Sequence, residues 1–251
     1  VSEMKNLKAL QLLSAGYENY LPWLPQGVLL CNGAGIHDTA TAELAVALAL
    51  TSLRHLDEYA RNMTSGLWKL HFSDSLADKR VTIFGYGRIG KAIERRVSAF
   101  EPESITRVAR SARTEDGKPV HGFAELDEVL RRTDVLFLIA PLTAETEGIV
   151  NERTLALLPD KALVVNVARG KVVVTEDLVA ECASGRLRAA LDVTDPEPLP
   201  PDHPLWTTPG VFISPHGGGQ AKAFFPRATR MLAPQLRRFA AGEPLANVVA
   251  P

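Results

Sequence analysis

The chain has 251 residues, of which 46% are hydrophobic and 23% are charged, and its formal net charge is −1. This composition is typical of a globular protein with one large or two modest domains, and the balanced charge gives no general electrostatic reason to bind nucleic acid or an anionic membrane. The apolar runs, such as residues 44–50, are too short to cross a bilayer.

The two cysteines, Cys31 and Cys182, lie far apart in the sequence and in no metal-ligand pattern. We therefore expect free thiols, no disulfide scaffold and no metal site, a pattern that favours a reducing, cytoplasmic location. No secretory signal is recognisable at the start of the sequence. Because the sequence begins at Val1 rather than at Met, we expect that upstream residues are missing from it.

The N-terminal part contains two short apolar runs followed by a long helical pattern. Residues 8–13 and 28–31 are predicted to be buried strands. From Thr41 onward, apolar residues recur at helical spacing, and this helix is predicted to reach Asn62, with Thr39 or Thr41 as its N-cap.

From residue 80 onward, strands and helices alternate. The predicted strands are residues 80–84, 105–108, 135–139, 162–167, 189–193 and 211–214. The predicted helices follow the first strand as far as about residue 100 and then occupy residues 123–131, 151–158, 175–184 and 226–241, with Pro234 expected to kink or split the last. This alternation predicts an α/β fold with a doubly wound parallel sheet.

A glycine-rich turn joins strand 80–84 to the next helix. It consists of Gly85, Tyr86, Gly87, Arg88, Ile89 and Gly90. In this context Gly85 permits a tight turn, Gly87 lets the backbone approach a pyrophosphate, and Gly90 lets the helix pack closely on the strand. Free N–H groups at the start of the helix favour phosphates. The turn therefore predicts a dinucleotide-binding domain, the alternative being a glycine-rich turn that binds nothing.

The end of the second strand indicates which dinucleotide binds. Proteins that bind NAD usually carry an acidic residue there, which holds the ribose hydroxyls. This sequence instead has Arg110, Ser111 and Arg113. A guanidinium binds a 2′-phosphate well, whereas a carboxylate repels it, so NADP(H) is favoured over NAD(H). The alternative is a solvated basic loop.

Three later segments place ionisable residues at the carboxyl ends of predicted strands, where a doubly wound sheet carries its chemistry. They supply Arg169, Glu197 and His216. Arg169 can bind a substrate carboxylate and polarise a carbonyl, and a protonated His216 can donate a proton to the developing alkoxide. Glu197 beside the imidazole would orient it and stabilise its charged form. This chemistry suits the reduction of a 2-oxo acid, although each residue taken alone is compatible with a purely structural role.

These motifs, in their order and spacing, resemble those of the D-isomer-specific 2-hydroxyacid dehydrogenases. The resemblance runs over essentially the whole chain and is carried by residues 41–45, 85–90, 140–143, 166–170, 191–198 and 214–216. It implies two doubly wound domains with the active site in the cleft, a homodimer, and Arg169, Glu197 and His216 as the catalytic trio. Arg110 and Arg113 are most similar to the pattern of the NADP-linked glyoxylate and hydroxypyruvate reductases.

The resemblance also implies roles for further residues. Asp192 is similar to the residue that meets the nicotinamide carboxamide, with the backbone of Val167 and Ala168 beside it. Pro141 and Thr143 resemble part of the adenosine-side wall. Ala15 and Gly16 match the loop whose backbone amides hold the substrate carboxylate, next to Arg169 and His216.

We expect residues 48–217 to form the dinucleotide-binding domain, and residues 1–47 with 218–251 to form a smaller substrate domain. Members of the family usually carry several dozen more residues before the segment equivalent to residues 8–13, so the smaller domain is expected to be N-terminally incomplete in the sequence as given. Residues 217–219 are three glycines, which leaves the shape of the pocket, and hence the substrate, open.

Two other functions remain open at this point. The first is oxidation of formate or phosphite by a related enzyme, although formate dehydrogenases of this superfamily pair the histidine with glutamine rather than with a residue like Glu197. The second is a dinucleotide-sensing, corepressor-like binding protein, which keeps the same trio. Consumption of NADPH with glyoxylate, hydroxypyruvate or pyruvate distinguishes an enzyme from a binding module.

Overall fold

The computed structural model describes residues 4–250. The chain divides into two compact units: a larger one from Thr41 to Gly218, and a smaller one that contains the described residues up to Ala40 and from Gly219 onward. These bounds differ by a few residues from the expected domains. The assignment of the domains to cofactor and substrate stays a prediction.

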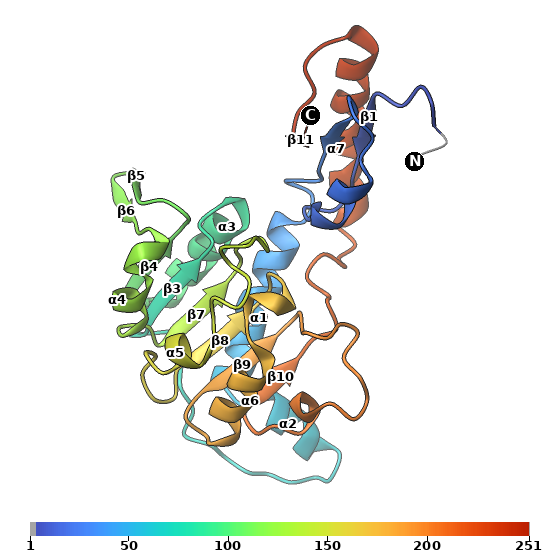
Figure 1. The fold of residues 1–251 in the computed structure, drawn as a ribbon. Helices are drawn as coiled ribbons and strands as arrows, with labels where there is room; N and C mark the ends of the chain where they lie inside the picture. The colour runs from blue at the N-terminus through green and yellow to red at the C-terminus, as the bar shows by residue number, and fades with distance from the viewer. Residues whose placement is uncertain (1–3, 251) are drawn as a thin grey trace. The chain divides into compact units, whose positions relative to one another are not determined.

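The larger unit is built on a six-stranded sheet. Its strands, in spatial order, are β10 (Val211–Ile213), β9 (Arg188–Leu191), β8 (Leu163–Asn166), β7 (Val135–Leu138), β3 (Arg80–Phe84) and β4 (Ser104–Val108). All neighbouring strands are parallel, which confirms the predicted sheet. Strand β3 lies between β7 and β4 (Figure 1), so the segments that follow those two strands flank the glycine-rich turn after β3.

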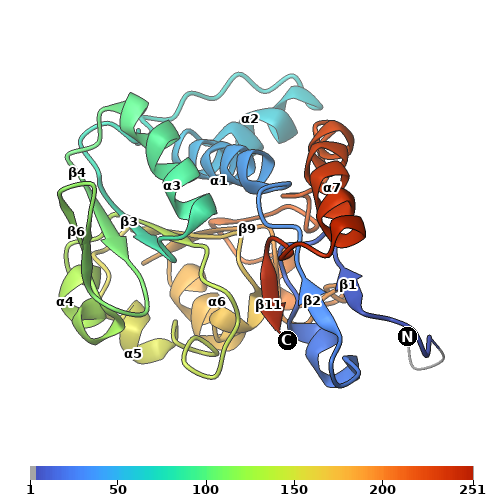
Figure 2. The ribbon, with the colours of Figure 1, turned by 90° about the horizontal axis from the view of Figure 1, so that it is seen from above.

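Helices cover both faces of this sheet (Figure 2). Helices α1 (Asp38–Leu53) and α3 (Arg88–Val97) lie on one side. The part of α1 from Ala42 onward and the buried face of α3 pack in a cluster that includes Val81 and Ile83 of β3. On the other side α4 (Leu126–Leu130), α5 (Glu152–Leu155) and α6 (Thr175–Ala183) pack against a cluster that includes Phe84. Successive strand side chains point to opposite faces, so one apolar strand serves both cores.

The long N-terminal helix was predicted incorrectly at both ends. Helix α1 begins at Asp38, so Thr39 and Thr41 lie in its first turn rather than at the N-cap. It ends at Leu53, and a left-handed residue, His55 (φ 54°), separates it from α2 (Leu56–Met63). The carbonyl of Ser52 accepts a hydrogen bond from Arg188 Nη1 (3.1 Å), a tertiary contact that the helical spacing could not reveal.

A β-hairpin follows β4 and was not predicted. Strands β5 (Arg113–Glu115) and β6 (Lys118–Val120) pair in antiparallel fashion around Asp116 and Gly117, which both have positive φ. Asp-Gly is a common sequence for such a tight turn, because both central residues must adopt left-handed backbone. Arg113 therefore lies on a hairpin strand and not in an open loop.

The smaller unit contains a three-stranded sheet and one long helix. Strands β1 (Ala9–Gln11) and β2 (Leu29–Cys31) are parallel, and β11 (Val248–Ala250), which was not predicted, pairs with β2 in antiparallel fashion. The two ends of the described chain thus share one sheet. Helix α7 (Phe224–Ala241) is continuous through Pro234, so the proline does not split it. The amide of Gln235, one residue later, is buried and donates to Gln11 Oε1 and to Ala246 O (both 2.8 Å).

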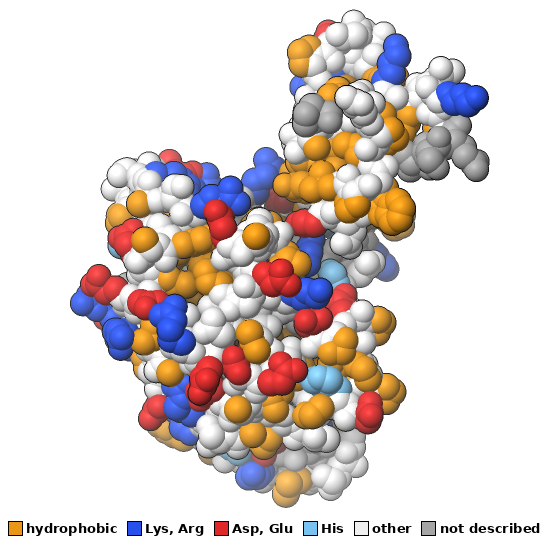
Figure 3. Space-filling model, in the orientation of Figure 1, with side chains coloured by type: hydrophobic (Ala, Val, Ile, Leu, Met, Phe, Trp, Pro, Cys, Tyr) orange, Lys and Arg blue, Asp and Glu red, His pale blue; other side chains and the backbone are white. Residues whose placement is uncertain are grey.

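The surface of the larger unit carries acidic and basic side chains interspersed with one another on the face shown in Figure 3. This mixture agrees with the nearly balanced charge of the whole chain. Among residues 4–250, no helix has the length and apolar character needed to span a membrane.

Candidate active site

The glycine-rich turn is shaped by two close backbone approaches. Gly85 has a φ of 111°, and a Cβ placed there would lie 2.4 Å from the backbone nitrogen of Ala140. A Cβ on Gly90 would lie 2.5 Å from the carbonyl oxygen of Gly85. Both positions therefore require glycine for packing, as the spacing predicted.

Gly87 differs from its two neighbours because its surroundings are open. Within the part of the chain that the structure describes, and apart from the residues next to it in the chain, no heavy atom lies within 4 Å of a Cβ placed on Gly87. Gly87 is also the N-cap of α3, and no described side chain caps this end of the helix. A helix start with free N–H groups and open space in front of it fits the phosphates of a dinucleotide.

The side chain of Tyr86 points into the protein rather than toward this open space. Its hydroxyl donates to Glu94 Oε2, and its ring lies 4.7 Å from the guanidinium carbon of Arg107. Arg107 in turn donates to Glu94 Oε1 through Nη2 (2.6 Å). Burial and the Glu94 carboxylate raise the pKa of Tyr86; burial alone would raise the pKa of Glu94, but the hydrogen bonds from Arg107 and Tyr86 outweigh it and lower that pKa. Of the other turn residues, Arg88 is exposed and Ile89 is half-buried.

The predicted 2′-phosphate residues lie beyond the end of β4. Arg110 is exposed and its Nε lies 2.7 Å from Glu145 Oε2. Arg113 Nη2 donates to the carbonyl oxygen of Tyr86 (3.0 Å) and to Glu115 Oε2 (2.9 Å). Ser111 is exposed. The structure thus brings Arg113 to the glycine-rich turn, while Arg110 contacts the segment after β7.

That segment contains Pro141 and Thr143 and is held by one threonine that sequence reasoning missed. Thr146 is 2% exposed; its hydroxyl donates to Pro141 O (2.7 Å) and accepts from the Thr143 N–H (2.8 Å). Because the hydroxyl closes the turn from inside, the backbone around Thr143 is fixed beside the turn after β3.

Arg169 is positioned by a buried asparagine. The Asn166 side chain, 1% exposed, accepts from Ala168 N (3.0 Å) and donates to Arg169 O (3.0 Å). Arg169 Nη1 donates to Ala168 O (2.6 Å). Val167 and Ala168 are themselves buried. A Cβ on Gly170 would lie 1.9 Å from Thr194 O, so the Arg169 turn packs directly on the segment after β9.

Asp192 organises the histidine loop. Its Oδ1 accepts from the Ser214 hydroxyl (2.7 Å) and the Gly217 N–H (2.7 Å), and its Oδ2 accepts from the Gly218 N–H (2.8 Å). A carboxylate offers about four acceptor sites, so these bonds leave it little further capacity. The expected contact of Asp192 with the nicotinamide carboxamide stays a prediction, whereas its role in holding the loop is plain.

His216 and Glu197 form an ion pair on adjacent loops. His216 Nδ1 lies 2.5 Å from Glu197 Oε1, with side chains that are 51% and 40% exposed. The His216 backbone has a φ of 54°, and its N–H bonds to Asp192 O (2.8 Å). Nδ1 is therefore committed to Glu197, and the ring nitrogen Nε2 points away from it.

The catalytic candidates thus share one edge of the sheet. Arg169 follows β8, Glu197 follows β9, and His216 follows β10, and these three strands are parallel neighbours. The glycine-rich turn follows β3 at the same edge. A cation, an imidazole oriented by a carboxylate, and a turn whose shape suits phosphate form a set of groups that fits reduction of a 2-oxo acid by a dinucleotide.

The predicted carboxylate-binding loop belongs to the smaller unit. Ser14 Oγ donates to Gly16 O (2.8 Å), and Asn32 Nδ2 donates to Ala15 O (2.8 Å). Among residues 4–250, no hydrogen-bond acceptor is found for the N–H groups of Ala15 and Gly16. Two such amides are suited to bind a carboxylate.

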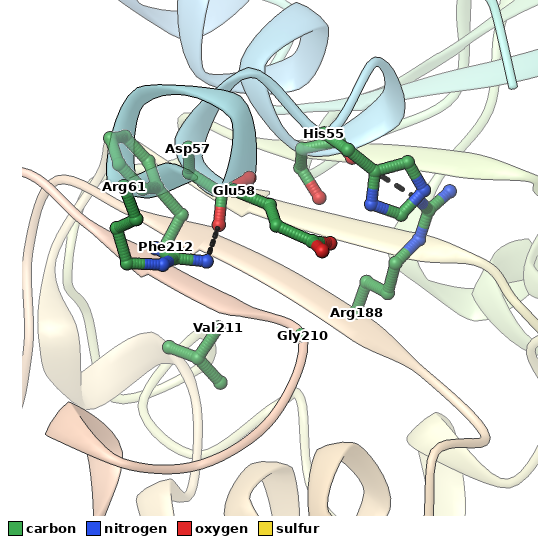
Figure 4. Close-up of a pocket in the computed structure, with 9 residues that line it drawn as sticks. His55, Asp57, Glu58, Arg61, Arg188, Gly210, Val211 and Phe212 are labelled. Carbon is green, nitrogen blue, oxygen red and sulfur yellow. Dashed lines mark hydrogen bonds and ion pairs between the residues drawn. The ribbon is translucent and has the colours of Figure 1, made fainter. Parts of the chain in front are cut away.

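A further pocket, of about 240 Å³, lies at the opposite edge of the larger unit's sheet, where β9 and β10 begin (Figure 4). His55 lies beside Arg188 there, and Asp57, Glu58 and Arg61 complete a wall of mixed charge. No group of three or more His, Cys, Asp or Glu residues within the described chain is arranged to hold a metal ion. This pocket is remote from the catalytic candidates.

Comparison with known proteins agrees with the geometry. Residues 46–218 match the model of the D-isomer-specific 2-hydroxyacid dehydrogenase NAD-binding domain. The glyoxylate reductase/hydroxypyruvate reductase of Mus musculus is 34% identical over 85% of this chain and 68% of its own length.

Solved structures give the same result. The NADPH-dependent glyoxylate/hydroxypyruvate reductase of Sinorhizobium meliloti, solved with NADP and sulfate, has a TM-score of 0.85 and 30% identity, over 97% of this chain and 78% of that one. The NAD-dependent formate dehydrogenase of Staphylococcus aureus, solved with NAD, has a TM-score of 0.84 and 28% identity. The match covers 98% of this chain and 76% of that one.

Proposed function

This chain belongs to the D-isomer-specific 2-hydroxyacid dehydrogenase family, and we propose that it transfers a hydride between NADP(H) and glyoxylate, hydroxypyruvate or a similar small 2-oxo acid. The family consists of NAD(P)-dependent oxidoreductases that act on small hydroxy and oxo acids. The observation that carries the proposal is the ion pair of His216 with Glu197 at the sheet edge that also bears Arg169 and the glycine-rich turn.

In this proposal each catalytic residue has one task. The nicotinamide supplies the hydride when the cofactor is bound. Arg169 binds the substrate carboxylate and stabilises the negative charge that grows on the carbonyl oxygen. His216 donates a proton from Nε2 to that oxygen, and Glu197, bonded to Nδ1, stabilises the imidazolium and fixes the ring. In the oxidative direction the same imidazole accepts the proton. The amides of Ala15 and Gly16 are proposed to bind the substrate carboxylate as well.

The preference for NADP(H) rests on the segment after β4. Arg110 and Arg113 supply two guanidinium groups on this segment: Arg113 contacts the glycine-rich turn through Tyr86 O, and Arg110 pairs with Glu145 in the segment after β7. The NADPH-dependent reductase of S. meliloti supports this choice. Asp192, Val167 and Ala168 are proposed to lie on the nicotinamide side, and Pro141 and Thr143 on the adenosine side.

A homodimer is part of the proposal. In the segment between α2 and β3, several large apolar side chains are exposed, among them Trp68 (98%) and Phe72 (fully). Apolar side chains that are exposed together mark interaction surfaces. Light scattering is expected to give twice the mass of the chain, and replacing both Trp68 and Phe72 by Glu is expected to lower that mass.

The test is consumption of NADPH with a panel of acids, namely glyoxylate, hydroxypyruvate and pyruvate, with NADH run in parallel. We expect turnover of at least one acid and a higher kcat/KM with NADPH than with NADH. Arg110→Asp is expected to lower the kcat/KM for NADPH and to leave that for NADH unchanged. Arg132→Ala is the control, because Arg132 is a distant, exposed arginine that pairs with Glu128. Equal kcat/KM for both cofactors in the unchanged chain contradicts the NADP preference.

The similarity to a formate dehydrogenase favours one second candidate, oxidation of formate or phosphite. The same assay run with formate or phosphite and NAD(P)⁺ tests it. Turnover there, without turnover of the oxo acids, replaces the first proposal by the second.

A further inference from the structure

An ion pair spans the two segments that flank the glycine-rich turn. Arg110 comes from the segment after β4, and Glu145 comes from the segment after β7, while the turn itself follows β3, the strand between them. The Arg110 Nε and Glu145 Oε2 atoms are 2.7 Å apart. The pair therefore joins the side proposed to bind the 2′-phosphate to the side proposed to bind the adenosine.

The two partners differ in how firmly they are held. The turn that carries Glu145 is closed by the buried hydroxyl of the next residue, Thr146, which holds the backbone on either side of Glu145. Arg113, the other proposed phosphate ligand, is already bonded to Tyr86 O and Glu115. The Arg110 side chain is 65% exposed and contacts Glu145 through Nε, so Arg110 is the less firmly held of the two arginines.

We propose that Glu145 is a specificity-determining residue, whose carboxylate competes with the 2′-phosphate of NADP(H) for Arg110. The inference rests on the proposed use of NADP(H). A phosphate that bonds to the Nε of Arg110 displaces the Glu145 carboxylate, and one that bonds to the other guanidinium nitrogens shares the cation with that carboxylate at close range, so in both cases the carboxylate weakens phosphate binding to Arg110. NAD(H) carries a hydroxyl in place of the phosphate and leaves the pair intact. Glu145 therefore reduces the preference for NADP(H) over NAD(H) that Arg110 provides.

The pair is exposed, so its effect is modest. Exposed ion pairs change an equilibrium by about two- to fivefold. Glu145→Gln keeps the size and polarity of the side chain but removes its charge. This variant should bind NADPH about two- to fivefold more tightly than the unchanged chain, and its affinity for NADH should stay within about twofold.

The experiment measures binding by calorimetry, so that it does not depend on turnover. The probes are NADPH, NADH, and the pair 2′,5′-ADP and 5′-ADP, which isolates the 2′-phosphate from the nicotinamide. The variants are Glu145→Gln, Arg110→Ala and the double variant. Glu147→Gln is the matched control, because it removes the same charge from an exposed residue two positions along the same segment.

We expect Glu145→Gln to raise the affinity for NADPH and 2′,5′-ADP but not for 5′-ADP. In the Arg110→Ala background the same change should have no effect. An equal gain in Glu147→Gln, or no gain, overturns the competition. A gain that persists in full without Arg110 also overturns it, since competition for Arg110 then has no part in the effect. If the unchanged chain binds NADPH and NADH equally and Arg110→Ala alters neither, the proposed NADP preference fails together with the inference. If Arg110 matters and Glu145 does not, only the inference fails.

Discussion

Nδ1 of His216 lies 2.5 Å from Oε1 of Glu197, although the two residues belong to different loops. The loop of Glu197 follows β9 and that of His216 follows β10, and Asp192 ties the second loop down through Ser214, Gly217 and Gly218. The imidazole is therefore oriented from two sides, by its own backbone and by the carboxylate.

Removal of the imidazole should abolish proton transfer and leave cofactor binding intact. We expect His216→Ala to lower reductive kcat by roughly a hundredfold or more, the usual scale for a lost general acid. NADPH affinity, measured by fluorescence titration, should stay within about threefold, because the phosphate site is separate. His71→Ala, in a comparable His71–Glu58 pair with a 2.8 Å separation, is the control and should retain turnover. Near-normal kcat in His216→Ala would remove the histidine from the mechanism.

Glu197 acts through His216, so its replacement should affect kcat more than KM. Glu197→Gln retains a hydrogen-bonding group but removes the charge that stabilises the imidazolium. We expect a fall in reductive kcat of roughly tenfold or more, with little change in the KM of the acid. Steady-state kinetics separates the two parameters. A change confined to KM would instead indicate that Glu197 contacts the substrate.

Two substitutions in the glycine-rich turn should distinguish an effect on cofactor binding from an effect on folding. Gly87 has a φ of −104° and open surroundings, so Gly87→Ala should fold normally, yet its methyl group occupies the space proposed for phosphate. We expect NADPH affinity to fall by at least about tenfold, with a Tm within about 2 °C of the unchanged chain. Gly90→Ala is the opposite case, because its Cβ meets Gly85 O at 2.5 Å and should destabilise the fold itself. Unchanged NADPH affinity in Gly87→Ala would show that the dinucleotide does not approach this turn.

Local patterns predicted much of the larger unit. Strand β3 and the turn that follows it have a periodicity and glycine spacing that depend on neighbouring residues only, and both were found as expected. The break at His55 was missed because the apolar residues keep their helical spacing across it; its left-handed backbone, and the contact of Arg188 with the nearby carbonyl of Ser52, are visible only in the fold. Asn166 was noted only as part of the motif at residues 166–170, and Thr146 was missed, because the effect of each lies in which backbone groups it contacts, and the residue type alone gives no signal of that.

The two cysteines should be unreactive in the folded protein. Both are free and fully buried. Burial raises the pKa of the Cys182 thiol to about 12 and also raises that of Cys31, and thiolate is the reactive form. We expect no reaction with a disulfide reagent at pH 8 before unfolding, and reaction of both thiols in denaturant. Rapid labelling of the native protein would contradict this. Replacing both by Ser should leave turnover within a few-fold.

The last prediction concerns Glu94, which joins the dinucleotide turn to β4. It is 8% exposed, accepts from Tyr86 and Arg107, and its pKa lies below the usual 4.5. A carboxyl whose pKa is lowered on folding contributes stability above its unfolded pKa, and this stability is lost as the pH falls through the folded pKa. Glu94→Gln leaves the Arg107 charge buried without its anion, so the free energy of unfolding at pH 7 should fall by about 3 kcal/mol.

This deficit should depend on pH in a defined direction. Urea unfolding of the cofactor-free protein at pH 7 should show the full difference between the unchanged chain and Glu94→Gln. Below about pH 4.5 the difference should shrink, because the carboxyl of the unfolded chain then takes up a proton while the native carboxyl stays charged, and it should vanish once the pH falls below the lowered pKa of the native carboxyl. Glu128→Gln is the control, since its pair with Arg132 is exposed with a separation of 3.6 Å, and it should cost less than about 0.5 kcal/mol at either pH. A deficit in Glu94→Gln that stays constant from pH 7 to pH 4 would mean that Glu94 stabilises the fold through packing and not through its charge.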